Sequence, residues 1–225
     1  MRTLAIGDIH GCYAAFETLL EAVGVTSDDS LILLGDYIDR GPESKAVVAR
    51  VIKLLERGKV WALQGNHEVM ILMARKNSRE FQSWRCCGGE ETLNSYHAEF
   101  HDDWRQSVPD DHWKFFEETR PWLETETHIF VHASVVPDAD MVDQPEYVLY
   151  WDRFDPRLRH KSGKIVICGH TVQQSGEPAL GARSVCIDTG IYLSKWLTCL
   201  DVDTGKYWQA NERQAVRTGE LSNLG

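Results

Sequence analysis

The sequence predicts an α/β fold in one domain that spans residues 1–225. Two observations support this fold class. Short apolar runs alternate with helical stripes through the first third of the chain, and short apolar runs return in the last third. The chain has 225 residues, of which 43% are hydrophobic, and this is enough to bury one sizeable core.

The first third predicts a βαβαβ unit. Strands are expected at residues 3–6, 31–34 and 60–63. Between them, apolar residues recur at the spacing of one helix face, first from Phe16 to Val23 and then from Val47 to Leu55. Pro42 suits the first turn of the second helix. Helices that connect consecutive strands make those strands parallel, with the helices packed on the sheet.

The middle of the chain, residues 70–127, predicts a helical excursion over the sheet. Helices are expected at 90–97 and 110–119, and half of the eight tryptophans lie in this excursion. We expect these tryptophans to form its core. The alternative is that Trp84 or Trp104 lines a substrate groove that the excursion shapes.

The last third predicts further strands. They are expected at residues 128–131, 164–168, 184–187, 197–202 and 207–210. The sequence Asp-Thr-Gly at 203–205 separates the final pair and is typical of a hairpin turn. The tail after Asn211 is polar, and we expect it to fray.

Composition excludes several classes of protein. The formal net charge is −10, which disfavours sequence-independent binding of nucleic acid polymers. Nothing in the sequence suggests a membrane segment, and Asp8 interrupts the short N-terminal apolar run, so neither a bilayer span nor a signal peptide is expected. The six cysteines form no Cys-x-x-Cys pair and predict reduced thiols in a cytoplasmic protein, with a structural zinc site as the alternative.

Polar side chains follow the predicted strands at the points where they end. The candidate ligands are Asp8, His10, Asp36, Asn66, His132 and His170. Since the carboxyl ends of parallel strands meet at one edge of a sheet, these side chains should lie together. Oxygen and imidazole ligands without thiolate suit manganese, iron or zinc. Six ligands are too many for one tetrahedral ion but fit two ions that share a carboxylate.

The ordered motifs resemble those of a known family. They are Gly-Asp-Ile-His-Gly at 7–11, Gly-Asp-Tyr-Ile-Asp-Arg-Gly at 35–41, Gly-Asn-His-Glu at 65–68, and two later histidines, His132 and His170. This set is similar to the PPP-type serine/threonine protein phosphatases within the calcineurin-like metallophosphoesterases, in particular the small bacterial and phage members. The resemblance implies two packed mixed β-sheets flanked by helices.

The resemblance also implies a role for each site residue. Asp8, His10 and Asp36 would bind one metal ion, and Asp36 would bridge to a second ion held by Asn66, His132 and His170. His67 would be the general acid, oriented by Asp39. Arg40 would hold the phosphate together with Arg153, which lies in a Trp-x-Arg pattern. The ions would be two divalent cations, with Mn²⁺ expected and Fe or Zn possible.

The predicted activity is hydrolysis of phosphoserine or phosphothreonine in proteins, with phosphotyrosine also possible, by direct attack of a metal-bridging hydroxide. A symmetrical dinucleoside tetraphosphate hydrolase is the alternative enzyme, although Asp39 argues mildly against it. A catalytically inactive scaffold that binds phosphoproteins is the alternative outside enzymes. A phosphoprotein, phosphopeptide or nucleotide is the expected partner; the sequence does not predict the oligomeric state.

Overall fold

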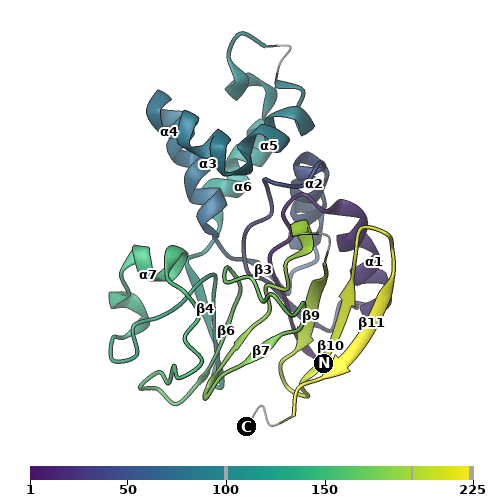
Figure 1. The fold of residues 1–225 in the computed structure, drawn as a ribbon, viewed down its shortest axis with the longest axis vertical. Helices are drawn as coiled ribbons and strands as arrows, with labels where there is room; N and C mark the ends of the chain where they lie inside the picture. The colour runs from purple at the N-terminus through teal and green to yellow at the C-terminus, as the bar shows by residue number, and fades with distance from the viewer. Residues whose placement is uncertain (99–100, 194, 223–225) are drawn as a thin grey trace.

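The first of two β-sheets contains the predicted parallel unit. In a computed structural model that describes residues 1–98, 101–193 and 195–222, this sheet has six strands in the order β11–β10–β9–β1–β2–β3 (Figure 1). The strands are β1 (Thr3–Ile6), β2 (Ser30–Leu33), β3 (Val60–Ala62), β9 (Leu197–Asp201), β10 (Lys206–Ala210) and β11 (Val216–Glu220). Strands β1, β2 and β3 are parallel, as predicted, and β9 runs antiparallel to β1.

The second sheet has five strands in the order β4–β5–β6–β8–β7. They are β4 (Trp122–Glu124), β5 (His128–Val131), β6 (Ile165–Cys168), β7 (Ala179–Leu180) and β8 (Ser184–Cys186). The three central strands are parallel, whereas β4 and β7 pair antiparallel at the two edges. The expected fold of two mixed β-sheets flanked by helices is therefore confirmed.

Side-chain alternation along each strand divides the core into layers. Ala5 on β1 faces the second sheet and packs in one cluster with Phe130 of β5 and Ile167 of β6. Its neighbours Leu4 and Ile6 point the other way and pack with the helices that cover the first sheet. Since successive side chains of a strand point to opposite faces, a fully apolar strand is what a sheet covered on both faces requires.

Helices cover the outer faces of both sheets. Helix α1 (Tyr13–Val23) and helix α2 (Ser44–Leu55) pack on the first sheet, and α7 (Glu146–Trp151) packs on the second. Helix α1 ends at Gly24, which has a φ of 61°. This is the left-handed conformation, which glycine adopts without a steric cost. Among the described residues, no helix combines the length and the apolar character needed to cross a bilayer.

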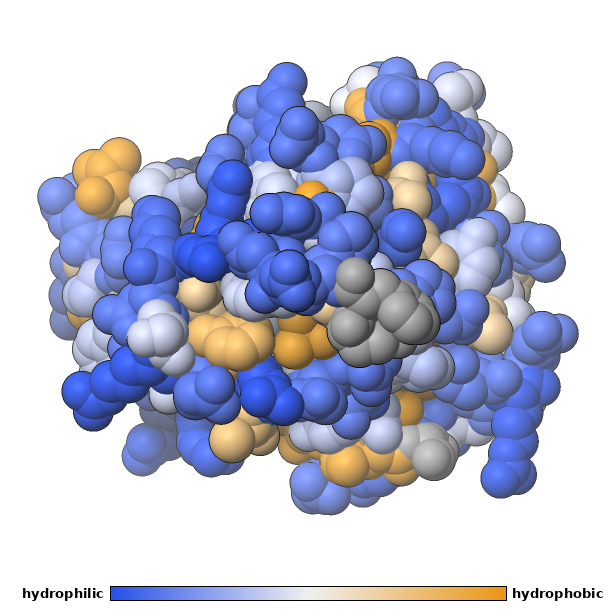
Figure 2. All heavy atoms as spheres, turned by 90° about the horizontal axis from the view of Figure 1, so that it is seen from above, coloured by the Kyte–Doolittle hydropathy of each residue, from blue (hydrophilic) through white to orange (hydrophobic). Residues whose placement is uncertain are grey.

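A group of helices stands over one end of the two sheets, and we call it the helical segment (Figure 1). It contains α3 (Asn66–Lys76), α4 (Ser78–Trp84), a π-helical turn (Arg85–Gly89), α5 (Glu90–Ser95), a 3₁₀ turn (Trp104–Ser107) and α6 (Asp110–Glu118). Seen from above, this face of the molecule is mostly hydrophilic, with apolar side chains in small separate groups (Figure 2). The predicted excursion began at residue 70 and ended at 127, but α3 begins at Asn66, and residues 122–124 belong to the second sheet.

The tail after Asn211 differs from the prediction. Instead of fraying, residues 216–220 form β11, which pairs antiparallel with β10 at the edge of the first sheet. Gly219 lies opposite Tyr207, and the ring of Tyr207 occupies the space that a side chain at this position would need. Backbone hydrogen bonds and this close approach stabilise a strand whose polar sequence carries no apolar signal.

Candidate metal centre and active site

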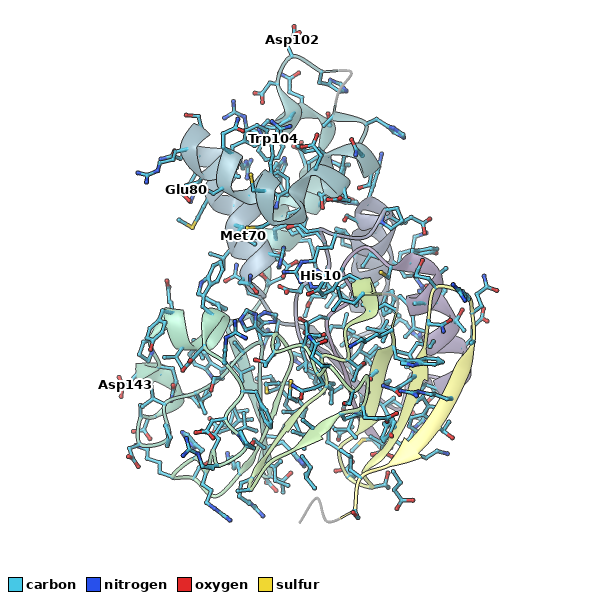
Figure 3. The ribbon with its side chains drawn as sticks, in the orientation of Figure 1. His10, Met70, Glu80, Asp102, Trp104 and Asp143 are labelled. Carbon is cyan, nitrogen blue, oxygen red and sulfur yellow. The ribbon has the colours of Figure 1, made fainter. Side chains whose placement is uncertain are left out.

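The polar clusters that follow strands of both sheets meet beneath the helical segment. Asp8 and His10 follow β1, Asp36 follows β2, Asn66 begins α3 after β3, His132 follows β5, and His170 follows β6. In Figure 3, His10 lies between the helical segment and the sheets. Five of the six predicted ligands are buried, and His170 is partly exposed.

One half of the centre is built around Asn66. Its side-chain oxygen lies 2.9 Å from His132 Nε2 and 3.0 Å from His170 Nδ1. Asp36 Oδ1 lies 3.4 Å from the same nitrogen of His132. Asp36, His132 and His170 form one of two groups that could hold a metal ion. These four side chains are the set expected for the second ion.

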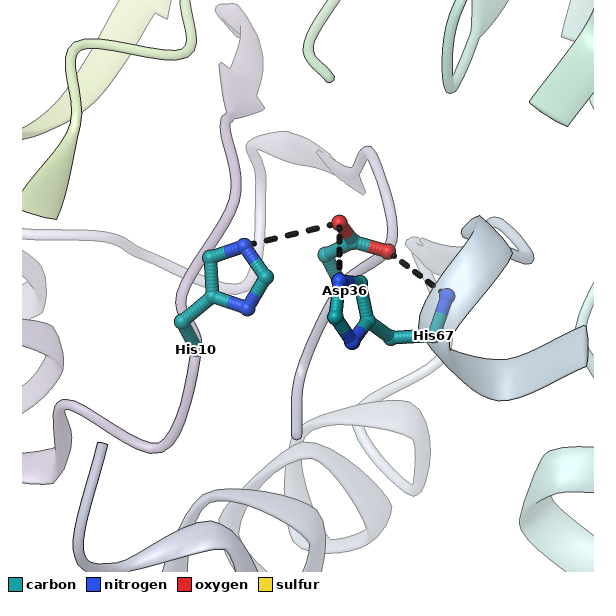
Figure 4. Close-up of side chains that lie close together, drawn as sticks. All are labelled: His10, Asp36 and His67. Atoms are coloured by element: carbon teal, nitrogen blue, oxygen red, sulfur yellow. Dashed lines mark hydrogen bonds and ion pairs between the residues drawn. The ribbon is translucent and has the colours of Figure 1, made fainter. Parts of the chain in front are cut away.

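The other half of the centre also uses Asp36. Its Oδ2 lies 3.5 Å from His10 Nε2 and 3.9 Å from His67 Nε2, and these three residues form the second candidate group (Figure 4). Asp8 lies beside the centre, where both of its oxygens accept the backbone N–H of His170 at 3.1 Å. The structure therefore places Asp36 between the two halves, as a bridging ligand requires, and brings His67 into the group where Asp8 was expected.

Each of the three predicted histidine ligands uses its other ring nitrogen in a backbone hydrogen bond. His10 Nδ1 lies 3.0 Å from the carbonyl of Ile38, His132 Nδ1 lies 2.9 Å from that of Leu34, and His170 Nε2 lies 3.3 Å from that of Trp151. The N–H of each ring donates to the carbonyl, which leaves the opposite nitrogen facing the centre as an acceptor. This is the arrangement in which proteins hold metal-binding imidazoles.

Burial sets the charge state of these groups. It lowers the pKa of His10 and His132 well below the usual range, which keeps both imidazoles neutral. Burial also raises the pKa of Asp8 well above its usual value, with Asp188 adding to the effect, and raises that of Asp36, with Glu68 adding. Neutral imidazoles beside buried, mutually repelling carboxylates fit divalent cations, whose charge would offset this repulsion.

The backbone of the centre is held in an uncommon conformation. Seven described non-glycine residues have positive φ, and five of them belong to the predicted site: His10, Asp36, Asp39, Arg40 and His170. Such conformations cost of order 1–3 kcal/mol each and persist where surrounding contacts enforce them. At Asp36, with φ of 53°, the Glu68 carboxylate accepts the backbone N–H groups of Asp36, Tyr37 and Gly65 at 2.8, 2.9 and 2.9 Å.

Sequence reasoning missed two acidic residues of this region. The sequence shows Glu68 only as part of a motif, because its partners are backbone N–H groups that no sequence pattern displays. Asp188 is buried, and its Oδ2 has no hydrogen-bond partner among the described residues. Its charge helps to raise the pKa of Asp8, after burial itself. The Asp-Thr-Gly run at 188–190, directly after an apolar strand, was the available signal.

Asp39 and His67 form the predicted pair. Nδ1 of His67 lies 2.6 Å from Asp39 Oδ2, and both side chains are buried. His67 Nε2 has no hydrogen-bond partner among the described residues and faces Asp36. A polar atom left unpaired at this depth is costly unless a ligand uses it. Nε2 is therefore the atom through which His67 can act on a bound molecule.

The two predicted phosphate-binding arginines differ in their surroundings. Arg40 Nη1 donates to His10 Nε2 at 2.8 Å, and its guanidinium lies 4.3 Å from the ring centre of Tyr192. Since His10 Nε2 cannot accept from Arg40 and bind a cation at once, Arg40 must leave this nitrogen when an ion binds. Arg153 is exposed, and its charge contributes, after burial, to a lowered pKa of His170. Arg40 therefore contacts the centre, whereas Arg153 acts on it only through its charge.

Comparisons with known proteins agree with this geometry. A symmetrical bis(5'-nucleosyl)-tetraphosphatase of Acidovorax sp. (strain JS42) is 44% identical over 80 residues, which are 35% of this chain and 28% of that protein. The asymmetrical bis(5'-nucleosyl)-tetraphosphatase PrpE of Bacillus subtilis is 28% identical over 86% of this chain and 87% of its own length. A cold-active protein tyrosine phosphatase structure shares the fold, with a TM-score of 0.65, 17% identity, and coverage of 96% of this chain and 78% of that one.

The family is established by the motif-bearing part of the chain. The Metallophos family, described as calcineurin-like phosphoesterase, matches residues 1–174, which include every predicted metal ligand from Asp8 to His170. The strand-end ligands and the shared Asp36 lie within this match, whereas strands β7 to β11 lie beyond it. The chain therefore belongs to the calcineurin-like phosphoesterase family, and its site is that of a metal-dependent phosphoesterase.

Proposed function

We propose that this protein hydrolyses dinucleoside tetraphosphates at a centre that holds two divalent cations. The main support is the position of Asp36, which belongs to both groups of candidate ligands, each able to hold one ion. Mn²⁺ is the proposed ion, with Fe or Zn as alternatives. When bound, the two ions would supply positive charge toward the phosphoryl oxygens and lower the pKa of a coordinated water toward neutrality.

The ligand assignment follows the sequence prediction. His10 and Asp36 would hold the first ion together with Asp8, which must turn from the His170 N–H toward it. Asn66, His132 and His170 would complete the second ion with Asp36. Arg40, once released from His10, would donate to the phosphoryl oxygens, and Arg153 would approach from the exposed rim. Guanidinium groups suit this role because they donate two parallel hydrogen bonds to one phosphate.

His67 is the proposed proton donor. Its free Nε2 faces the centre, and Asp39 fixes the ring through Nδ1. Burial lowers the pKa of His67 well below its usual range, so the resting ring is neutral and Nε2 carries no proton. Once Nε2 has taken up a proton, the imidazolium that Asp39 holds through Nδ1–H can pass that proton to the oxygen that leaves phosphorus. The donation matters most where that oxygen is a poor leaving group, such as the alkoxide of serine.

We propose dinucleoside tetraphosphate as the first candidate substrate because the match to the PrpE relative extends over most of both chains. The match to the Acidovorax enzyme spans only 28% of that protein, so it supports the centre and not the whole activity. Phosphoproteins are the second candidate substrate. The Asp39–His67 pair favours them, since an anhydride releases a good leaving group and has little need of a proton donor. An inactive scaffold is disfavoured because it would not need this pair.

A side-by-side rate comparison tests the proposal. We would measure kcat/KM for diadenosine tetraphosphate, a phosphoserine peptide and 4-nitrophenyl phosphate, with Mn²⁺ and with a chelator. We expect all activity to vanish with the chelator, and tetraphosphate to exceed the peptide by at least about 10-fold, roughly 1.4 kcal/mol. Faster turnover of the peptide would establish the second candidate. Activity that survives the chelator, or that survives in Asp36→Asn, would reject the metal centre.

A further inference from the structure

The helical segment contacts the Asp39–His67 pair through Trp84 and Thr92. Trp84 Nε1 donates to Asp39 Oδ2 at 2.8 Å, and Thr92 Oγ1 donates to Asp39 Oδ1 at 2.6 Å. His67 Nδ1 shares Oδ2 with Trp84. Both oxygens of Asp39 are thus engaged by donors, from Trp84 at the end of α4 and from Thr92 in α5.

The hydroxyl of Thr92 is itself fixed by its neighbours. Thr92 Oγ1 accepts the backbone N–H of Asp39 at 2.9 Å and lies 2.9 Å from Ser44 Oγ. A hydroxyl has one proton. Since that proton goes to the Asp39 carboxylate, Ser44 must donate to Thr92. Thr92 therefore holds both the backbone and the side chain of Asp39.

The same stretch of chain also contacts the backbone of Arg40. The carbonyl of Gly88 accepts the Arg40 N–H at 3.0 Å. Gly88 has φ of 109°, and a Cβ at this position would lie 2.7 Å from Arg40 Cγ. The turn between Trp84 and Thr92 is therefore fitted closely against residues 39 and 40, which makes its contacts with Asp39 specific rather than incidental.

A buried carboxylate needs these donors. Burial raises the pKa of Asp39 to about 7, and the hydrogen bonds from Thr92 and Trp84 oppose that rise. Without them, the carboxylate would be left in an apolar surrounding with His67 as its main partner, and its orientation would no longer be fixed. The ring of His67 would then lose the geometry that directs Nε2 toward the centre.

We propose that Trp84 and Thr92 are positioning residues that hold Asp39, and through it His67, for proton donation to the leaving group. The proposal rests on the proposed role of His67 as proton donor. It assigns a function to the helical segment: the segment sets how well the enzyme turns over substrates whose leaving oxygen must be protonated. Trp84 is only 1% exposed, so it completes the Asp39 site and does not line an open groove.

Hydrogen-bond deletions on a series of aryl phosphates test this proposal. Trp84→Phe and Thr92→Val remove a donor and keep most of the packing, and Thr92→Ser restores the hydroxyl. Trp113→Phe is the matched control, because Trp113 is also buried in the helical segment and donates through Nε1, but to the carbonyl of Arg105. We would measure kcat with saturating Mn²⁺ on 4-nitrophenyl phosphate, a good leaving group, and on phenyl phosphate, a poor one.

We expect Trp84→Phe and Thr92→Val to lower kcat on phenyl phosphate by about 10- to 100-fold, which is part of the roughly 10²- to 10⁴-fold that a general acid contributes. The loss on 4-nitrophenyl phosphate should be less than about 3-fold. Thr92→Ser should recover most of the phenyl phosphate activity, and Trp113→Phe should not change the ratio of the two rates. A purely structural role would lower both rates together.

His67→Asn separates the two levels of the proposal. If His67→Asn shows strong dependence on the leaving group while Trp84→Phe and Thr92→Val do not, the positioning role is wrong and the donor role stands. If His67→Asn lowers both rates equally, the donor role falls, and the positioning role falls with it. Thr92→Val matches threonine in shape, so it tests the positioning role even if Trp84→Phe fails to fold.

Discussion

Glu68 Oε2 accepts the backbone N–H of Asp36 at 2.8 Å and thereby fixes the residue that joins the two halves of the metal centre. The same carboxylate accepts the N–H groups of Tyr37 and Gly65. Glu68 is fully buried, so water cannot replace it as the acceptor for these three groups. The left-handed conformation of Asp36 thus depends on a carboxylate that need not touch an ion.

Glu68→Gln should weaken metal binding. An amide has one accepting oxygen, and its NH₂ group would meet backbone donors, so at least one buried N–H would lose its partner. We expect Mn²⁺ affinity to fall about 10- to 100-fold, as for other residues that orient ligands. The free energy of unfolding of the metal-free protein should fall by about 1–3 kcal/mol. Titration calorimetry and urea unfolding measure the two effects.

A surface carboxylate gives the control for Glu68→Gln. Glu90 is half exposed and pairs with Arg85, so Glu90→Gln should leave metal affinity unchanged. Unchanged Mn²⁺ affinity in Glu68→Gln would show that Asp36 does not need this support.

Arg40 should matter more for catalysis than Arg153. Arg40 is half-buried beside His10, whereas Arg153 is exposed. Loss of a charge-assisted hydrogen bond costs about 1.5–3 kcal/mol, so Arg40→Ala should lower kcat/KM on 4-nitrophenyl phosphate about 10- to 100-fold. Arg153→Ala should cost less than about 10-fold. Arg157→Ala, at an exposed pair with Asp155, is the control and should have no effect.

The prediction would fail if Arg153→Ala were as damaging as Arg40→Ala. That result would mean that the exposed rim closes over the substrate and desolvates Arg153. Steady-state kinetics at pH 7 on all three variants distinguishes these cases.

The sequence was most informative where chemistry and local pattern coincide. Residues 3–6 and 128–131 form strands with the predicted bounds. An apolar run of four residues is too short for a helix and is typical of a buried strand. The structure also brings Asp39 and His67 together, with 2.6 Å between Oδ2 and Nδ1. The edge strand β11 was missed because its sequence, Val-Arg-Thr-Gly-Glu, is mostly polar and is held by backbone pairing with β10.

Contacts between side chains that lie far apart in the chain could not be predicted from the sequence. Trp84 and Thr92 lie 45 and 53 residues from Asp39 in the chain, and neither carries a motif that points to it. Glu68 acts on backbone groups, whose positions depend on the finished fold. These residues support the site rather than form it. Their amino-acid types occur throughout the chain, so only their positions in the folded structure reveal their contacts with the site.

Thiol labelling should divide the cysteines into two groups. Cys86 and Cys87 are exposed on the π-helical turn, and the other four cysteines are buried. All six are free, and neither candidate metal group in the described part of the chain contains cysteine. We expect two thiols to react rapidly with a colorimetric disulfide reagent in the native protein and six in denaturant. More than two fast thiols would contradict the burial of the others, and zinc release on labelling would revive the structural zinc alternative.

Asp29 should make stability depend on pH. Arg2 donates to Asp29 from Nε at 3.1 Å and from Nη2 at 2.6 Å, and the backbone of Thr26 donates at 2.9 Å. These hydrogen bonds, with that from Arg2 largest, lower the pKa of Asp29 below its usual value. A depressed pKa in the folded state stabilises the protein above the unfolded pKa of about 3.9, and this contribution is lost as pH falls further.

Asp29→Asn should therefore destabilise the metal-free protein by about 1–3 kcal/mol at pH 7, because charge-assisted hydrogen bonds are lost at a side chain that is only 5% exposed. The difference from the unaltered protein should persist down to about pH 5 and shrink toward pH 3, since Asp29 in the unfolded chain then gains a proton while Asp29 in the folded protein stays ionised. Urea unfolding at pH 7, 5 and 3 measures it. Asp155→Asn, at the exposed pair with Arg157, should leave stability unchanged at every pH. A gap for Asp29→Asn that stays constant from pH 7 to 3 would mean that packing, and not charge, accounts for the contribution of Asp29.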